Sequence, residues 1–578
     1  MRLNRVSVHN FRSIKDATFS LCNYSILVGA NNAGKTSLLT ALRIFYEDGI
    51  KFDEKNDFPK FQVDDQESWI EIEYLLADSE FATLKEEYKS LGNKLKVRKY
   101  LASLDEDRVK AGQSNIFGYE NGVLSKNLFY GARNISQAKL GSVIYIPETA
   151  QTDETLKLSG PSPLREMINF VVRKVVEKSE SFQNLNDAFQ KLDDKFREEQ
   201  SKEGLSLRSL FEDINKNLEE WKVKFDFTIN PLKPEEMVKN LVSHVLIDDA
   251  LEKEISIKNT GQGLQRQLIF TLLRLSSDYV ESKEYKKKEF SPELTLLLFE
   301  EPEAFLHPCQ QEYLNKDLQK IASEETQQVV ASTHSPIFVS RNIEDLTSLI
   351  KLKKESVITN TFQVSEETKK TILEQNSRLV EFLRSKLDDP SVGETTKQAI
   401  RRKLSQSNDD IKRMEEESIR YVLWLDATRC SAFFADIVLV CEGATEKTFI
   451  EYLIQNKWND LADRRACILD VMGKYNVHRY MNLFKELGIA HSVLLDKDED
   501  AGIQSFVNEF IQSQKNPLTR RIHFFEKDIE TFLGIPSPPL DRQDRKPLNV
   551  MWHYLKGKIP GEKIAELQTI VGNLLSGD

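Results

Sequence analysis

Residues 29–36 read Gly-Ala-Asn-Asn-Ala-Gly-Lys-Thr, a G-x-x-x-x-G-K-[ST] pattern that directly follows a short apolar stretch. Glycines let successive backbone N–H groups curl round phosphate oxygens, and the start of a following helix adds a favourable dipole. We expect Lys35 to reach the β- and γ-phosphates of a nucleotide and Thr36 to place its hydroxyl on Mg²⁺. The residues predicted to contact the nucleotide here are Asn31, Asn32, Gly34, Lys35, Thr36 and Ser37.

A second acidic element follows an apolar run at 294–299, which is typical of a buried central strand. The run ends in Glu300 and Glu301. A carboxylate at the end of such a strand can hold the Mg²⁺ of the nucleotide, and the next can polarise the attacking water. We therefore assign Glu300 to the metal and Glu301 to the water.

Two further elements are weaker signals for the same site. A predicted strand at 328–331 leads to His334, whose imidazole could sense the γ-phosphate, although a solvated loop histidine is the ordinary alternative. Between these motifs, Gly261 and Gly263 open an amphipathic helix, and helix N-termini attract anions.

Acidic residues also follow predicted strands in the last third of the chain. An apolar strand ends at Glu442, and Glu446 lies on the first turn of a helix if one begins after Gly443. Asp496 and Asp498 follow another strand, and residues two apart at a strand end project the same way. Carboxylates without nearby thiolates or imidazoles suit Mg²⁺ or Mn²⁺. The pattern predicts phosphodiester hydrolysis with two ions about 4 Å apart, one activating water and the other stabilising the leaving oxygen. Ordinary solvated acidic turns are the alternative.

These residues require an α/β framework that is interrupted by helices. Residues 1–46 are expected to form strand, turn, strand, glycine-rich loop and helix, with further strands at 67–75 and 143–146. Long, charged, glycine-poor helices are expected at about 163–240 and again at about 365–428. A final α/β region begins at 436, with strands near 466–471, 491–495 and 521–525.

Composition restricts the class of protein. The 578 residues exceed what one core can hold, and 40% hydrophobic with 30% charged residues is ordinary for a soluble protein. No apolar run reaches about 18 residues, and the N-terminus lacks a signal-peptide core, so we expect a cytoplasmic protein without a membrane partner. Five scattered cysteines without C-x-x-C spacing argue against disulfides and structural zinc. The net charge of −11 leaves room only for a local basic groove.

The order of the motifs in residues 1–350 resembles the ABC-type ATPase head of the SMC, RecF and OLD groups. The resemblance implies that ATP is sandwiched between two heads, with Gly261 and Gly263 acting on the partner's loop, and hence a homodimer or larger assembly. The chain departs from the family at Glu300, where an aspartate is usual. Weak ATP hydrolysis, or ATP that is bound in a structural role, is therefore an open alternative.

The C-terminal region resembles the Toprim fold of topoisomerases, DnaG-type primases and OLD nucleases, and the stretch 431–443 resembles OLD proteins specifically. By position, this resemblance makes Glu442 the Toprim glutamate and Asp496 and Asp498 the paired metal ligands. It also implies a later acid at Glu530. The lysine that assists the reaction in that family maps onto one of two residues, Lys556 or Lys558.

Together the resemblances predict an OLD-family protein whose cofactors are ATP with one Mg²⁺ and two further Mg²⁺ or Mn²⁺ ions in the Toprim site. The implied domains are an ABC-type ATPase (1–160 and 244–355), a helical insertion that dimerises (161–243), a helical connector (356–430) and a Toprim domain (431–578). The implied activity is DNA cleavage by an endonuclease in antiviral defence, controlled by the ATPase dimer. A second defence component, protein or nucleic acid, is an open alternative as a further control.

Three rival functions remain. An ATP-switched DNA-repair clamp of RecF/SMC type with an inactive Toprim domain is one, although the full set of carboxylates weighs against it. Strand passage would need a tyrosine nucleophile in a separate domain, and primer synthesis would need a zinc module that the cysteines do not offer. The last is a nuclease that stays silent until a partner or phage signal releases it.

Overall fold

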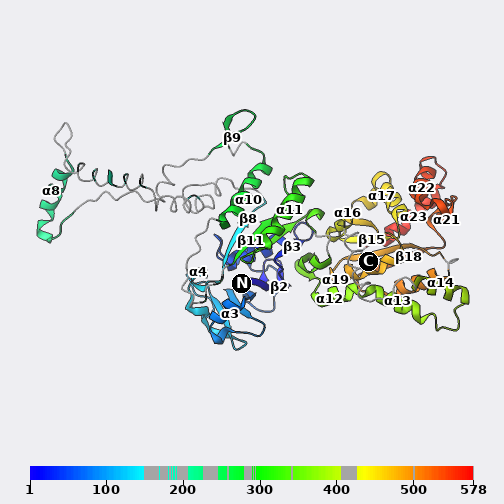
Figure 1. The fold of residues 1–578 in the computed structure, drawn as a ribbon, viewed down its shortest axis with the longest axis horizontal. Helices are drawn as coiled ribbons and strands as arrows, with labels where there is room; N and C mark the ends of the chain where they lie inside the picture. Colours follow the sequence, from blue (N-terminus) through cyan, green and yellow to red (C-terminus); the bar gives the residue numbers. More distant parts are fainter. Residues whose placement is uncertain are drawn as a thin grey trace. The chain divides into compact units, whose positions relative to one another are not determined.

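The computed structural model describes residues 1–148, 206–225, 245–256, 260–278, 294–339, 343–404, 426–498 and 502–576, with a few single positions between these ranges (Figure 1). The chain divides into two compact units. One unit consists of Met1–Glu148 together with Lys287–Asp578, and the other of Thr149–Lys286. The first unit therefore contains both the phosphate-loop motif and all the C-terminal carboxylates.

The described part of the second unit is mostly helical, and the predicted insertion 161–243 falls within this unit. Its elements are α8 (Leu207–Leu218), η3 (Glu219–Trp221), β9 (Leu246–Asp248), β10 (Lys253–Ile255) and α10 (Gln262–Asp278). Helix α8 begins where the side chain of Ser206 accepts a hydrogen bond from the backbone of Ser209. Much of the helical stretch predicted at 163–240 lies outside the described residues.

The N-terminal part of the first unit contains an antiparallel sheet in the order β2-β1-β4-β5-β6-β7. Its strands are β1 (Arg2–Phe11), β2 (Ile14–Ser20), β4 (Ser68–Leu75), β5 (Lys94–Ala102), β6 (Ile116–Glu120) and β7 (Val123–Leu128). Alternating residues put one face into the core, where Val8 and Ile72 are fully enclosed. The apolar stripe of α1 (Lys35–Phe45) belongs to the same core, including Leu38 and Phe45.

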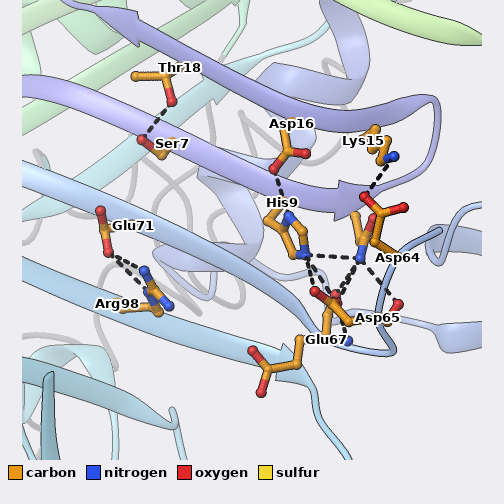
Figure 2. Close-up of polar contacts among 11 residues, drawn as sticks. Ser7, His9, Lys15, Asp16, Thr18, Asp64, Asp65, Glu67, Glu71 and Arg98 are labelled. Carbon is orange, nitrogen blue, oxygen red and sulfur yellow. Dashed lines mark hydrogen bonds and ion pairs between the residues drawn. The ribbon is translucent and has the colours of Figure 1, made fainter.

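Polar side chains pair across the strands on the other face of this sheet (Figure 2). The two ring nitrogens of His9 contact Asp16 at 2.7 Å and Asp65 at 3.1 Å, and Arg98 donates two hydrogen bonds to Glu71. His9 faces Asp16 and Glu71 faces Arg98 in the strand register. Pairs of this kind contribute roughly 0.2–1 kcal/mol each, so they help to fix the register but do not replace the core.

A second sheet, in the order β14-β13-β3-β12-β11-β8, carries the nucleotide motifs. Its strands are β3 (Tyr24–Val28), β8 (Ser142–Ile146), β11 (Thr295–Glu300), β12 (Gln327–Thr333), β13 (Leu349–Glu355) and β14 (Ile358–Gln363). Only β14 runs antiparallel to its neighbour. Parallel strands are covered on both faces, which explains the continuous apolar run that predicted β11. The predicted domain boundary at 355 falls between β13 and β14, and the sheet continues to Gln363.

The third sheet is entirely parallel, in the order β16-β15-β17-β18. Its strands are β15 (Ile437–Cys441), β16 (Ala466–Asp470), β17 (Ala490–Asp496) and β18 (Thr519–Phe525), close to the four predicted ranges. The helices around it include α17 (Ala444–Asn456), α19 (Val477–Glu486), α20 (Ile503–Ser513), α21 (Ile529–Leu533), α22 (Lys546–Leu555) and α23 (Gly561–Leu574). Leu439 of β15, Phe449 of α17 and Leu567 of α23 share one core. In Figure 1, α17, α22 and α23 lie on one side of this sheet.

Helices also connect and cover these sheets. Helix α11 (Pro308–Ala322) joins β11 to β12 and buries Leu314 and Leu318. The other helical segments of the first unit, within its described residues, are α2 (Glu54–Asp57), α3 (Asp78–Thr83), η1 (Glu86–Tyr88), η2 (Phe129–Gly131), α4 (Ile135–Ala138), η5 (Pro336–Phe338), η6 (Ile343–Ser348), α12 (Glu366–Leu373), α13 (Gln375–Ser385), α14 (Glu394–Leu404), α16 (Ala427–Cys430), η7 (Ser431–Phe434), α18 (Asn459–Ala462), η8 (Lys474–Asn476) and η10 (Leu540–Arg545). The α/β class predicted from the sequence is confirmed.

All five cysteines carry free thiols. Within the described ranges, no helix combines the length and the apolar character that a membrane crossing needs.

Candidate functional site

The phosphate loop connects β3 to α1, and two of its glycines are required by close contacts. A Cβ at Gly29 would lie 2.4 Å from the carbonyl oxygen of Leu352. Gly34 has a φ of +105°, and a Cβ there would lie 2.7 Å from the hydroxyl of Thr359. Both contacts are with the β13–β14 hairpin, which was not predicted from the sequence. The hairpin therefore shapes the loop from outside it.

Lys35 is the first residue of α1 and is 5% exposed. Its ammonium donates to the carbonyl oxygens of Gly29 at 3.0 Å and Ala30 at 3.2 Å, and lies 2.7 Å from Nε2 of His334. Burial lowers the pKa of Lys35 to about 8, against the opposing effect of Glu301 and neighbouring carboxylates. The predicted phosphate-binding lysine and the predicted γ-phosphate sensor are thus in direct contact.

Glu300 ends β11 beside the hydroxyl of Thr36, which donates to one of its carboxylate oxygens. The hydroxyl of Tyr145 donates to the other oxygen. Burial and the Glu300 carboxylate raise the pKa of Tyr145, so the phenol keeps its proton. This arrangement places Glu300 and Thr36, the two predicted Mg²⁺ contacts, side by side. Tyr145, on β8, was not predicted.

Glu301 lies one residue beyond β11 with a φ of 45°, and its backbone N–H donates to Ser332. Its carboxylate oxygen lies 3.1 Å from Nε2 of His334. Burial and the nearby acids Glu148 and Glu303 raise the pKa of Glu301, which favours a role as a proton acceptor. Burial and Lys35 lower the pKa of His334 to about 4, so its imidazole is neutral at pH 7.

Glu303 is a site residue that sequence reasoning missed. Its Oε1 accepts hydrogen bonds from the backbone of His334 at 2.5 Å and of Ser335 at 3.1 Å. It therefore fixes the backbone turn that presents the imidazole. The signal was available, because Glu303 belongs to the same acidic run as Glu300 and Glu301.

The other predicted nucleotide contacts lie as follows. Asn31 and Asn32 are exposed at the tip of the loop, and Ser37 is half-buried on the first turn of α1. Gly261 immediately precedes α10, and Gly263 is the second residue of that helix, in the second unit. The role predicted for these two glycines on a partner copy stays a prediction.

The C-terminal carboxylates gather at one edge of the third sheet, where the C-terminal ends of its parallel strands meet. Glu442 follows β15, and Asp496 ends β17, its neighbour in the sheet. Helix α17 begins at Ala444, and Glu446 on its first turn points back to accept a hydrogen bond from the backbone of Gly443 at 3.2 Å.

An unpredicted lysine connects two of these acids. The ammonium of Lys474 donates to Oδ2 of Asp498 at 2.9 Å and lies 3.8 Å from Oε2 of Glu442. The two carboxylate oxygens are therefore no further apart than the sum of those distances. Burial raises the pKa of Glu442, Lys474 opposes the rise and Asp498 adds to it. Lys474 follows Gly473 in the loop after β16, so its position beyond a strand end was the signal that could have found it.

Glu446 and Asp496 are the most strongly perturbed acids of the group. Glu446 is 5% exposed and Asp496 is 6% exposed. Burial raises the pKa of Glu446, and the nearby carboxylates Glu442 and Glu530 raise it further. Burial, Glu446 and Glu442 likewise raise the pKa of Asp496. These acids therefore hold protons more readily than exposed carboxyls unless a cation joins them.

Glu530, on α21, is fully buried, and Lys546 at the start of α22 lies 3.8 Å from its Oε2. Burial works against the charge of Lys546, yet Glu530 and Asp496 raise its pKa above the usual value. The predicted lysines lie elsewhere on the segment: Lys558 places its ammonium 4.1 Å from the ring centre of Trp552, and Lys556 ends α22. No contact among the described residues joins either of them to the carboxylates.

The donor set fits a hard divalent cation. Both carboxylate oxygens of Glu530, one of Asp496 and one of Glu442 are buried without a hydrogen-bond partner in the described part of the chain. Such orphaned oxygens are costly in a protein interior, and a bound cation would satisfy them. Among the same residues, no three acids, histidines or cysteines are arranged so that they could hold a metal ion without moving. The two lysines stand between the acids instead.

Comparison with known proteins gives two family matches, one over each of the two sites described above. Residues 1–339 match the family described as AAA ATPase domain, and residues 433–498 match the family described as Overcoming lysogenization defect protein-like, TOPRIM domain. The chain is 23% identical over 523 residues to the Old nuclease of Escherichia phage P2, covering 86% of this chain and 77% of that protein. It is also 23% identical over 523 residues to endonuclease GajA of Bacillus cereus (strain VD045), covering 86% and 75%.

Among solved structures, the SMC head domain from Thermotoga maritima aligns with 63% of this chain and 100% of that one, at 12% identity and a TM-score of 0.29. The SmcHead bound to the C-winged helix domain of ScpA aligns with 64% and 100%, at 14% identity and a TM-score of 0.35. The family matches, which span most of the chain, carry the assignment. This chain belongs to the OLD family, in which an AAA ATPase domain is followed by an OLD-like Toprim domain.

Proposed function

We propose that this protein is a metal-dependent DNA endonuclease whose Toprim carboxylates cut phosphodiester bonds under the control of its ATPase domain. The observation that carries the proposal is the convergence of Glu442, Glu446, Asp496, Asp498 and Glu530 around buried, unsatisfied oxygens at one sheet edge. The relatives named Old nuclease and endonuclease GajA support this reaction.

The five carboxylates would hold Mg²⁺ or Mn²⁺. Two such ions, when bound, would supply Lewis-acid activation of water and of the leaving oxygen. The chain's own groups would do the rest. Glu446, with its raised pKa, can accept the proton of the attacking water, and the ammonium of Lys546 can offset charge that develops on the phosphate.

ATP is proposed to bind between β3 and α1, with Lys35 on the phosphates and its Mg²⁺ on Thr36 and Glu300. Glu301 and His334 are in place for hydrolysis, since they contact each other and His334 also contacts Lys35. The carboxylate of Glu300 already lies against the Thr36 hydroxyl, so the longer side chain compensates for the missing aspartate. Dimerisation through two ATP-bound heads is part of this proposal.

Contacts within the first unit offer a route from the nucleotide to the nuclease site. Lys351 faces Val28, the last residue before the phosphate loop, in the register of β13 and β3. Its buried ammonium donates to the carbonyl of Phe433, at the entry to the third sheet. In parallel, η5, which follows His334, contacts α16. Arg429 of α16 donates to the carboxylate of Asp470 at 2.9 Å, at the end of β16.

The experiment is a cleavage assay on plasmid and linear DNA with Mg²⁺ or Mn²⁺, with and without ATP. Wild type should cut, Glu442→Ala should not, and Lys35→Ala should cut without responding to ATP. Glu509→Ala, at an exposed residue paired with Lys386, is the matched control and should behave as wild type. A wild type that binds DNA but cuts nothing under any of these conditions would contradict the proposal.

That outcome would favour the second function, an ATP-switched DNA clamp of RecF/SMC type. The contact of Lys474 and Lys546 with the acids is the observation that supports it, because lysines can neutralise such a site without any metal. A role in antiviral defence, with a controlling protein or nucleic acid, belongs to the main proposal. It is tested by phage infection of cells that carry wild type or Glu442→Ala.

A further inference from the structure

Lys474 is a buried cation placed among the predicted metal ligands. It is 2% exposed, donates to Asp498 at 2.9 Å and lies 3.8 Å from Glu442. An ammonium taken out of water costs several kcal/mol unless it is paired, and among the described residues these two carboxylates pair with it. A fixed positive charge therefore stands where a divalent ion bound by Glu442 and Asp498 would have to be.

The backbone that carries Lys474 is fixed. Gly473 has a φ of +112°, and its N–H donates to the carbonyl of Glu442 at 2.7 Å. Val471 donates to Cys441 at 3.1 Å, and the side-chain amide of Asn476 donates back to Val471 at 2.8 Å. The loop is thus tied to the end of β15, the strand that presents Glu442. The lysine is built into this position and is not a mobile surface side chain.

The two lysines divide the carboxylates into unequal halves. Lys474, from a buried position, offsets one of the two negative charges of the half formed by Glu442 and Asp498. Lys546 is 27% exposed in its side chain, and among the described residues its ion pair is the 3.8 Å contact with Glu530. The second half consists of Glu446, Asp496 and Glu530. Three of the four carboxylate oxygens that are buried without a hydrogen-bond partner belong to it, namely both oxygens of Glu530 and one of Asp496. A bound cation would therefore satisfy more buried oxygens in this half.

We propose that Lys474 is a resident cation of the Toprim site, a positioning residue that makes the two divalent-ion positions unequal. The first ion enters the half formed by Glu446, Asp496 and Glu530. The half formed by Glu442 and Asp498 binds an ion weakly, because that ion must displace the Lys474 ammonium. This inference rests on the proposed metal-dependent nuclease and specifies how its metal site fills.

The test counts Mn²⁺ ions on the full-length protein at fixed pH and ionic strength, from the free-Mn²⁺ signal in electron paramagnetic resonance. Wild type should bind one ion tightly and a second at least about tenfold more weakly. The second ion is weaker because the Lys474 ammonium, a like charge a few ångströms away, repels it. Lys474→Met should tighten the second site by about tenfold or more. Lys485→Met, at a half-exposed lysine paired with Glu486, should leave both sites unchanged.

Two results would overturn the inference. Lys474→Met with the same number and strength of sites as wild type is one. The other result is wild type that takes up two Mn²⁺ ions with equal affinity, seen as a spin-coupled pair at low loading. This second measurement uses no variant, so it tests the inference even if Lys474→Met fails to fold. In either case, wild type that still cleaves DNA leaves the proposed function standing. Wild type that binds no Mn²⁺ and does not cleave overturns both.

Discussion

The ammonium of Lys35 lies 2.7 Å from Nε2 of His334. This contact joins the lysine of the phosphate loop to the histidine that follows β12. Burial lowers the pKa of Lys35 to about 8 and that of His334 to about 4, so at pH 7 the ammonium donates and the neutral imidazole accepts. At pH 7 the pair therefore carries the positive charge that a phosphate requires. It loses this charge as the pH rises above the pKa of Lys35.

ATP affinity should fall as the pH rises above 8. A phosphate favours the charged ammonium, so binding above the lowered pKa of Lys35 must take up a proton, and Kd should rise by up to about tenfold per pH unit. Calorimetric titration with ATP between pH 7 and 9.5 measures this. Lys35→Arg keeps its charge throughout and should lose the pH dependence. Identical pH profiles for wild type and Lys35→Arg would contradict the interpretation.

Lys546, and not Lys556 or Lys558, should be the lysine on which cleavage depends. Lys546→Ala should lower the cleavage rate by about 10²-fold or more, the usual loss when one charge-stabilising donor is removed. Mn²⁺ binding should remain, because removing a cation from the acids does not weaken their attraction for metal. Lys558→Ala, which loses only its position over Trp552, should cut at nearly the wild-type rate. A larger loss in Lys558→Ala or Lys556→Ala would restore the assignment made from the sequence.

Asp496→Asn should stabilise the metal-free protein and abolish its stabilisation by Mn²⁺. Burial raises the pKa of Asp496, so its contribution to stability is present below the unfolded pKa and is lost as the pH rises through the folded pKa. At pH 7 the buried acid therefore lowers the stability of the metal-free protein. Asparagine removes this effect, so the melting temperature should rise by on the order of 2 °C. Thermal melts in EDTA and in Mn²⁺ test this, with the exposed Asp463→Asn as control.

The advantage of Asp496→Asn in EDTA should shrink at pH 5. Asp496 in the folded protein keeps its proton at both pH values, but at pH 5 the unfolded carboxyl is less completely ionised, so the raised pKa costs less stability. An Asp496→Asn protein that melts below wild type in EDTA at pH 7 would show that the carboxylate is satisfied by other groups.

Lys351→Met should separate ATP binding from its effect on cleavage. The variant removes the hydrogen bond to the Phe433 carbonyl, so the response of cleavage to ATP should fall to less than about twofold, where coupled sites usually show a 5- to 150-fold effect. The rate of cleavage in the absence of nucleotide should change little, and so should the affinity for ATP. Lys353→Met, on the same strand and paired with Glu355, is the matched control. An unchanged ATP response in Lys351→Met would place the coupling elsewhere.

The sequence was most informative where a strand is buried on both faces. Continuous apolar runs predicted β3, β11, β12 and the Toprim strands, and the acids at their ends were found for that reason. Strands β13 and β14 were missed, because Lys351 and Lys353 interrupt the apolar pattern of β13. The ammonium of Lys351 is nevertheless buried, since the carbonyl of Phe433, 82 residues later, accepts its hydrogen bond. A partner so distant in sequence gives no local signal.

The lysines show the same limit at the site itself. Lys556 and Lys558 were proposed because the family resemblance implies a lysine near the C-terminus. Lys546 lies near Glu530 because α22 packs against α17, a tertiary relationship that spacing cannot reveal. Lys474 was a different case, because its place after β16 and Gly473 resembled the strand-end positions that identified the acids.

Crystals soaked in Mn²⁺ and measured at the manganese absorption edge would locate the ions among the Toprim carboxylates. We expect an anomalous peak within about 2–2.6 Å of carboxylate oxygens of Glu446, Asp496 or Glu530, strong at low Mn²⁺, with any peak at Glu442 and Asp498 weaker. Mn²⁺-dependent DNA cleavage by the same protein, without an anomalous peak at any of these five carboxylates, would contradict this expectation.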